Sequence, residues 1–315
     1  MKSILFLSAI LLISCDNKTH QNNSDVVNST GIELIVLGIA QDAGFPQAGC
    51  EKENCKLYWE RKEEKRNATS LGLIDHSSGK YWLFEATPDF KFQLRQIQQI
   101  ARSSEIPSGI FLTHAHIGHY TGLMHVGHEV MGASGIPVYT MPRMKNYLET
   151  NGPWKQLVDY ENIALQQIKA DSAVQLSESI NVTPFLVPHR DEYSETVGYK
   201  IETENKSLLF IPDINKWGIW ERSIIEEIFK VDYAFLDATF FDSDELPGRN
   251  ISEIPHPFVE ESIDLFQDLT AEEKQKVYFI HFNHTNPLIL ESPERKEVET
   301  LGFKVAYEGM KIELE

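Results

Sequence analysis

The sequence predicts an α/β fold in which two mixed β-sheets pack face to face and helices cover their outer faces. Short apolar strands outnumber the helical segments, and the helices are inserted between them. Residues 32–315 contain no linker, low-complexity stretch or internal repeat, so we expect them to form one domain. Five of the strands are followed directly by histidine or aspartate, which places polar side chains at strand ends.

The first strands of this domain are apolar runs bounded by turn residues. Residues 33–37 are predicted to form a strand that leads into a Gly-rich loop at residues 38–49. Residues 70–74 and 81–84 are typical of two paired strands, and the turn Ser77-Ser78-Gly79 joins them.

Helical spacing of apolar residues appears next. It predicts a helix over residues 90–102, which ends before Ile106-Pro107. The apolar stretch at residues 109–112 indicates a buried strand. A short strand at residues 138–139 and a helix at residues 141–150 are expected to follow.

The second half of the domain continues this alternation of strands and helices. Strands are expected at residues 180–187, 197–201, 208–211, 233–236 and 276–280, and helices at residues 220–229 and 257–269. A final pair of strands, residues 304–307 and 311–313, closes the chain.

Three histidines follow the strand at residues 109–112 within six residues of one another. On a turn after a strand, His114 and His116 can point the same way, and a bend at Gly118 can return His119 beside them. Clustered imidazoles of this kind bind divalent transition metals. Surface histidines in a loop are the simpler alternative, but further candidate ligands follow later strands: His189, Asp213, Asp237 and His281.

Residues 1–14 are predicted to be a signal peptide, because one lysine precedes a short apolar run that ends in small residues. Leu12-Ile13-Ser14-Cys15 resembles the bacterial lipobox, in which the cysteine becomes the lipidated first residue. Residues 15–31 would then be a lipidated cysteine and a flexible polar tether. We therefore expect an exported lipoprotein, periplasmic or on the outer surface, that is anchored to the membrane. An ordinary signal peptide with an incidental Cys15 is the alternative.

The charge and the cysteines constrain the partners of the protein. The formal net charge of −18 disfavours nucleic acid and, with export, favours a small-molecule substrate. Cys50 and Cys55 are the cysteines left after Cys15. In an oxidising compartment they would form a disulfide, and otherwise they are two ligands of a structural metal.

From residue 32 onward, the candidate ligands and their order along the chain resemble those of the metallo-β-lactamase superfamily. The pattern of that family is H-x-H-x-D-H, followed by a lone His, an Asp and a final His. The resemblance implies zinc, as one or two ions, with Fe²⁺ or Mn²⁺ as alternatives. The ligands that it implies are His114, His116, His119, His189, Asp213 as a bridge, and His281, with His284 as the alternative to His281. Gly118 replaces the aspartate of the motif, which weakens the expected second site.

A narrower resemblance is to the pyrroloquinoline quinone biosynthesis protein B family. It rests on Gly44-Phe45-Pro46-Gln47, Ala86-Thr87-Pro88-Asp89, Asp237-Ala238-Thr239-Phe240, and His281 followed by Asn286-Pro287. In that family the cysteine cluster is C-x-C-x-x-C, and Lys52 replaces its middle cysteine. This resemblance implies an iron-dependent oxygenase.

The function that we prefer is a metal-dependent hydrolase, in which residues 32–315 use a metal-bound hydroxide on an ester, amide or phosphodiester. Asp213 would bridge the metals or orient the hydroxide. His256 matches a tRNase Z histidine that lies after the Asp/Glu-Ala-Thr-Phe segment, and it would stabilise charge or protonate the leaving group. The alternatives are the iron-dependent oxygenase and a metal-binding accessory protein with a degenerate second site.

Overall fold

The computed structural model describes residues 31–315. The predicted signal peptide, the lipidated Cys15 and most of the tether lie outside these described residues. Within residues 31–315, no helix combines the length and the apolar character that are needed to cross a bilayer.

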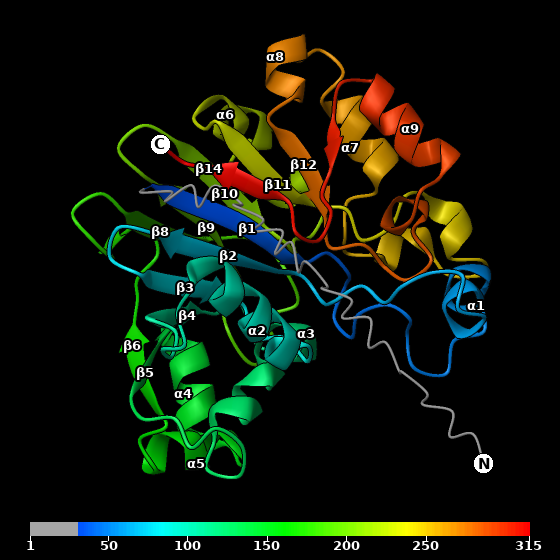
Figure 1. Cartoon of the computed structure of the whole chain (residues 1–315). Coiled ribbons are helices and arrows are strands. Elements are labelled where there is room, and N and C mark those ends of the chain that lie inside the picture. The colour runs from blue at the N-terminus through cyan, green and yellow to red at the C-terminus, as the bar shows by residue number, and fades with distance from the viewer. Residues whose placement is uncertain (1–30) are drawn as a thin grey trace, which may run out of the picture.

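Two sheets of seven strands form the centre of the domain, as Figure 1 shows. In spatial order, the first sheet contains β14 (Lys311–Glu313), β1 (Ile32–Gly38), β2 (Ser70–Asp75), β3 (Lys80–Phe84), β4 (Gly109–Phe111), β5 (Ile136–Thr140) and β6 (Ile163–Gln167). The second contains β13 (Lys304–Val305), β12 (Val277–Ile280), β11 (Tyr233–Asp237), β10 (Ser207–Ile211), β9 (Val197–Glu202), β8 (Asn181–Leu186) and β7 (Val174–Gln175). Both sheets mix parallel and antiparallel pairs, so the predicted class of fold is confirmed.

Helices lie on the outer side of each sheet (Figure 1). The first sheet carries α2 (Phe90–Ala101), α3 (Ile117–Tyr120), α4 (Pro142–Thr150) and α5 (Trp154–Asp159), and the second carries α6 (Ile224–Phe229), α7 (Val259–Leu265), α8 (Ala271–Lys274) and α9 (Pro293–Thr300). Helix α1 (Glu53–Trp59) lies in the long connection between β1 and β2. Short 3₁₀ helices occur at Thr121–Val126, Trp217–Ile219, Ser243–Glu245, Ile251–Glu253 and Pro287–Ile289.

The core has two parts. One lies between the first sheet and its helices, where α2 buries Phe90, Leu94 and Ile97 at helical spacing. The larger part joins the inner faces of the two sheets, and Phe84 of β3 contacts Tyr199 of β9 edge to face there. Burial of both faces of the strands explains why they are continuous apolar runs in the sequence.

Three sequence predictions differ from the structure. The final strands do not pair with each other, because β13 extends the second sheet and β14 the first. Helix α6 begins only at Ile224, after Ser223 accepts a hydrogen bond from the Glu226 N–H. Helix α7 begins at Val259 and ends at Leu265, so both predicted helices were too long. The helices and strands that the sequence analysis missed are α1, α3, α5, β6, β7, α8 and α9.

Candidate metal centre

The predicted ligands lie at one edge of the sandwich. Strands β1, β3 and β4 run in the same direction within the first sheet, and β8, β10, β11 and β12 do so within the second. The loops after these strands meet where the two sheets are joined by backbone hydrogen bonds. The N–H of Gln41 donates to the carbonyl of Phe282 at 2.8 Å, and the N–H of Val197 donates to that of Thr113 at 3.2 Å. The carboxyl ends of strands are a common position for binding sites.

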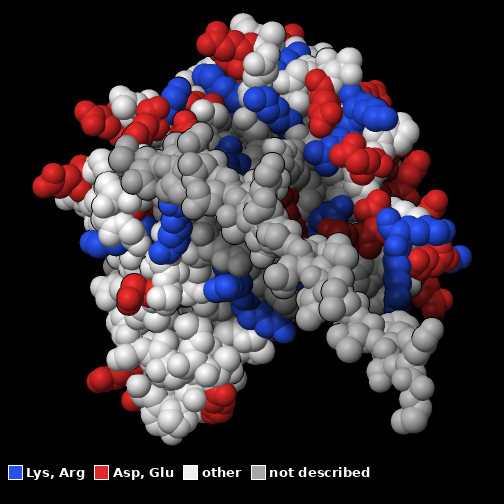
Figure 2. All heavy atoms as spheres, in the orientation of Figure 1, with Lys and Arg blue, Asp and Glu red and all other residues white. Residues whose placement is uncertain are grey.

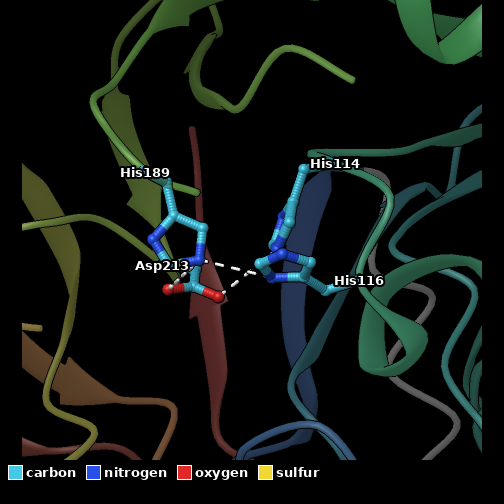
Figure 3. A group of neighbouring side chains, drawn as sticks. All are labelled: His114, His116, His189 and Asp213. Carbon is cyan, nitrogen blue, oxygen red and sulfur yellow. Dashed lines mark hydrogen bonds and ion pairs between the residues drawn. The ribbon is translucent and has the colours of Figure 1, made fainter. Parts of the chain in front are cut away.

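Four of the predicted ligands form a first cluster, with one ligand atom from each within 4.8 Å of the others: His114, His116, His189 and Asp213. Figure 3 shows the Asp213 carboxylate facing the imidazoles. Oδ1 of Asp213 lies 3.2 Å from Nε2 of His189, and Oδ2 lies 3.4 Å from Nε2 of His114. Nδ1 of His116 lies 3.3 Å from Nε2 of His189.

The composition of this first cluster fits a divalent transition metal. Nε2 of His114 and Oδ1 of Asp213 are buried and make no hydrogen bond, although other polar atoms are close to them. Buried polar atoms are almost always paired, so atoms that converge without hydrogen-bond geometry indicate a common cation. Three imidazoles and one carboxylate suit Zn²⁺, and also Fe²⁺ or Mn²⁺.

A threonine determines which nitrogen of His114 is available. The hydroxyl of Thr113 donates to Oε1 of Glu85 at 2.5 Å. It therefore accepts from Nδ1 of His114, which lies 2.9 Å away. The lone pair of His114 is then on Nε2, which points at Asp213. Such hydrogen bonds orient metal-binding histidines and select their tautomer.

The same arrangement recurs at His281. The hydroxyl of Thr239 donates to Oδ1 of Asp237 at 2.7 Å and lies 3.0 Å from Nδ1 of His281. This leaves the lone pair of His281 on Nε2, which is buried without a hydrogen bond. In His116 the roles of the two ring nitrogens are reversed. Glu192 lies 3.0 Å from its Nε2, and its Nδ1 faces the cluster.

A second cluster contains His119, His281 and Asp42, again with one ligand atom from each within 4.8 Å of the others. Asp213 lies between the clusters, because its Oδ2 is 3.4 Å from Nε2 of His114 and 3.7 Å from Nε2 of His119. Sequence reasoning missed Asp42. The signal that could have found it is its position in the loop after an apolar strand, which is the position of the other ligands.

Electrostatics favour a cation at this edge. Burial lowers the pKa of His119, but the carboxylates of Glu85, Asp213 and Asp42 outweigh burial and raise that pKa to about 9. Burial alone would raise the pKa of Asp213, but neighbouring imidazoles, first His189, hold that pKa well below its usual range. Buried carboxylates that stay ionised require a positive partner.

His256, the predicted acid, lies beside both clusters. Its Nδ1 is 3.2 Å from Oδ1 of Asp213 and 2.9 Å from Oδ2 of Asp237. Burial lowers the pKa of His256, but Asp237 and Asp213 raise it to about 9. Oδ2 of Asp237 also accepts from the N–H of Ile214 at 3.1 Å, so this carboxylate holds the loop after β10 as well.

His284, the alternative to His281, lies in a different cluster. Its ring approaches Cys50 and Cys55, and one ligand atom from each residue lies within 4.8 Å of the others. Both cysteines are free thiols. Burial, together with contact with Cys50, raises the pKa of Cys55 to about 11. The structure therefore places His284 with the cysteines and His281 with His119.

The fold and these ligands define a metallo-β-lactamase fold protein. The family model described as the beta-lactamase superfamily domain matches residues 81–282, and the chain belongs to this family. Within it, the chain is similar to coenzyme PQQ synthesis protein B. It is 25% identical to that protein from Rhizobium meliloti, with coverage of 91% of this chain and 99% of the relative. It is 28% identical to that of Acinetobacter baylyi, with coverage of 89% and 99%.

Solved structures show the same fold. The Zn²⁺-bound PqqB from Methylobacterium extorquens matches with a TM-score of 0.74 at 23% identity, and the match covers 89% of this chain and 99% of that one. A diphosphatase from the PhnP family matches with a TM-score of 0.63 at 20% identity, covering 90% and 96%. The short form of human tRNase Z has a TM-score of 0.56 at 15% identity, covering 90% and 99%.

Proposed function

We propose that the protein is a metal-dependent hydrolase of a small molecule that carries an ester, amide or phosphodiester. The observation that carries this proposal is the first cluster, in which three imidazoles and the Asp213 carboxylate converge with unpaired buried atoms. When bound there, Zn²⁺, Fe²⁺ or Mn²⁺ would lower the pKa of a water ligand towards neutrality and polarise the substrate.

The residues of the chain would hold and aim the reacting groups. Asp213 lies between the two clusters and would orient the nucleophile from that position. His256 is held by Asp237 beside Asp213, and it would donate a proton to the leaving group. Access is from the side of His116 and Asp42, whose side chains are 16% and 35% exposed, whereas that of His114 is 1% exposed.

A small substrate is supported by charge. The net charge of −18 opposes polyanions such as RNA at long range. Figure 2 shows acidic side chains spread among basic ones on the face that carries α8 and α9. A small molecule approaches such a surface with less repulsion than a phosphate backbone.

We also propose that the protein is exported and anchored to the membrane through a lipid on Cys15. The support is the sequence Leu12-Ile13-Ser14-Cys15 after a short apolar run. Multiple acyl chains at one residue would give a firm anchor.

The test is a panel of ester, amide and phosphodiester substrates with the purified protein, first stripped by a chelator and then reloaded with Zn²⁺ or Mn²⁺. We expect turnover of one class after reloading, and no turnover in the stripped protein. His116→Ala should lose most of the bound metal and the activity, because it removes a ligand from the first cluster. His128→Ala is the matched control, because that histidine is exposed and lies in neither cluster. Unchanged metal content in His116→Ala would contradict the proposal.

The second candidate is an iron-dependent oxygenase. The observation that favours it is similarity to coenzyme PQQ synthesis protein B over 99% of the length of that relative. An oxygenase would consume O₂ after anaerobic loading with Fe²⁺, whereas a hydrolase would turn over in the absence of O₂. An accessory protein would bind metal and show neither activity.

A further inference from the structure

The loop after β1 brings Asp42 to the second cluster. Ala40 bridges Phe282, and the N–H of Gln41 donates to the carbonyl of Phe282 at 2.8 Å. Because Phe282 follows His281 in the chain, this pairing places Asp42 beside the His281 ring. The contact joins segments about 240 residues apart in the sequence, and it depends on the packing of the two sheets.

Three atoms in this second cluster lack partners. Oδ1 of Asp42, Nε2 of His119 and Nε2 of His281 are each buried and make no hydrogen bond. Oδ1 of Asp42 lies 3.7 Å from Nε2 of His119. The side chains of His119 and His281 are 1% and 0% exposed, so water does not satisfy these nitrogens at the surface. A carboxylate oxygen and two imidazole nitrogens that converge in this way are a ligand set for a divalent metal, which binds as the imidazoles release their protons.

Gly118 explains why the carboxylate comes from residue 42. A Cβ atom at Gly118 would lie 2.3 Å from Cα of Asp42 and 2.7 Å from its Oδ1. The Asp42 side chain therefore occupies the space that a side chain at residue 118 would enter. The φ of Asp42 is 40°, in the left-handed region that aspartate adopts more readily than most residues. Glycine at 118 and aspartate at 42 are thus complementary in shape.

We propose that Asp42 supplies the carboxylate of a second divalent metal site, with His119 and His281, in place of the aspartate that the family motif has at residue 118. The proposal rests on the metal site of the proposed function and adds a ligand from a different loop. Under this proposal the second site has a carboxylate ligand although residue 118 is glycine. Asp213, which lies 3.7 Å from His119, would connect this site to the first cluster.

The test measures metal binding and needs no substrate. The stripped full-length protein is titrated with Zn²⁺ and its stoichiometry is measured, and a parallel sample is loaded with Mn²⁺ for electron paramagnetic resonance. The wild type should bind two zinc ions at the two His/Asp clusters, apart from any ion held by Cys50, Cys55 and His284, and should show a spin-coupled Mn²⁺ pair, which reports on the His/Asp clusters because Mn²⁺ disfavours thiol ligands. Asp42→Asn should keep one ion and show uncoupled Mn²⁺. Its affinity for the second ion should fall by more than about 100-fold, because even residues that only orient metal ligands contribute about 10–100-fold to affinity.

Glu51→Gln is the matched control, because it removes a negative charge from the same connection at an exposed position. It should bind both ions as the wild type does. Gly118→Ala is the second variant, and it should also weaken the second ion, since its Cβ displaces the backbone of Asp42. Circular dichroism checks that each variant is folded. Binding of only one ion by the wild type, or retention of both by Asp42→Asn, would overturn the proposal. If two ions bind and depend on Asp42 but no substrate turns over, the proposed function fails and this inference stands.

Discussion

The carboxylate of Asp237 holds the imidazole of His256, with Oδ2 2.9 Å from Nδ1. The same carboxylate accepts from the N–H of Ile214 at 3.1 Å and from the N–H of Thr239 at 2.9 Å. The orientation of the His256 ring is therefore set through Asp237 by backbone N–H groups of two loops. One is the loop after β10, which contains Asp213, and the other is the loop after β11. Hydrogen bonds of this kind fix the orientation of the imidazole.

His256→Ala should keep the native metal content and lower kcat by roughly 10²–10⁴, the range for a lost general acid. The reason is that His256 is outside both groups of metal ligands but touches Asp213. Elemental analysis of the purified variant measures its metal content, and single-turnover kinetics measure the chemical step. His128→Ala is the control. Equal kcat in His256→Ala and the wild type would remove His256 from the mechanism.

Thr113→Val should weaken metal binding at the first cluster by about 10–100-fold, because the hydroxyl that fixes the His114 tautomer is lost. Thr140→Val is the matched control, since the hydroxyl of Thr140 is also buried but makes no hydrogen bond. It should leave metal affinity unchanged and the free energy of unfolding equal or higher. Competition with a chromophoric chelator measures both affinities. The same affinity in Thr113→Val and Thr140→Val would show that the hydrogen bond to His114 is unimportant.

Glu308 should make stability depend on pH. Burial raises the pKa of Glu308 to about 7, although its carboxylate accepts from the N–H of Asn67. The folded state then binds a proton more tightly than the unfolded state, so the contribution of Glu308 to stability is full below about pH 4.3 and is lost as the pH rises to about 7. Glu308→Gln should remove this dependence and gain roughly 1–3 kcal/mol relative to the wild type between pH 4.5 and pH 8.

Urea unfolding of the wild type and Glu308→Gln at several pH values gives this difference. Glu272→Gln is the control, because Glu272 is exposed. A free-energy difference between Glu308→Gln and the wild type that stays constant from pH 4.5 to pH 8 would contradict the shifted pKa of Glu308.

Cys15→Ser should abolish lipid labelling and release the protein from the membrane fraction, if the predicted lipobox is used. Metabolic labelling with an alkyne fatty acid, followed by fractionation, measures both. Cys50→Ser is the control and should be labelled as the wild type is. Labelling and membrane retention of Cys15→Ser at the wild-type level would refute lipidation at this residue.

Much of the fold follows from local pattern. Strands such as β1, β4 and β11 are apolar enough to be recognised alone, and α2 shows its helical spacing directly. The missed strands β6 and β7 lie at sheet edges and carry polar side chains, so their sequences lack this signal. The pairing of β13 and β14 with different sheets depends on contacts with distant strands and leaves no local trace.

Local sequence is enough to indicate which residues could bind metal. Each candidate follows an apolar strand or lies in the loop directly after one: His114, His116, His119, His189, Asp213 and His281. How these residues group depends on the packing of the two sheets. The fold places the candidate histidines in two clusters, brings His284 beside Cys50 and Cys55, and brings Asp42 to the second cluster. The physical reason is that residues 42, 118 and 281 meet only where the loops of two packed sheets hydrogen-bond to each other. Spacing along the chain carries no information about that contact.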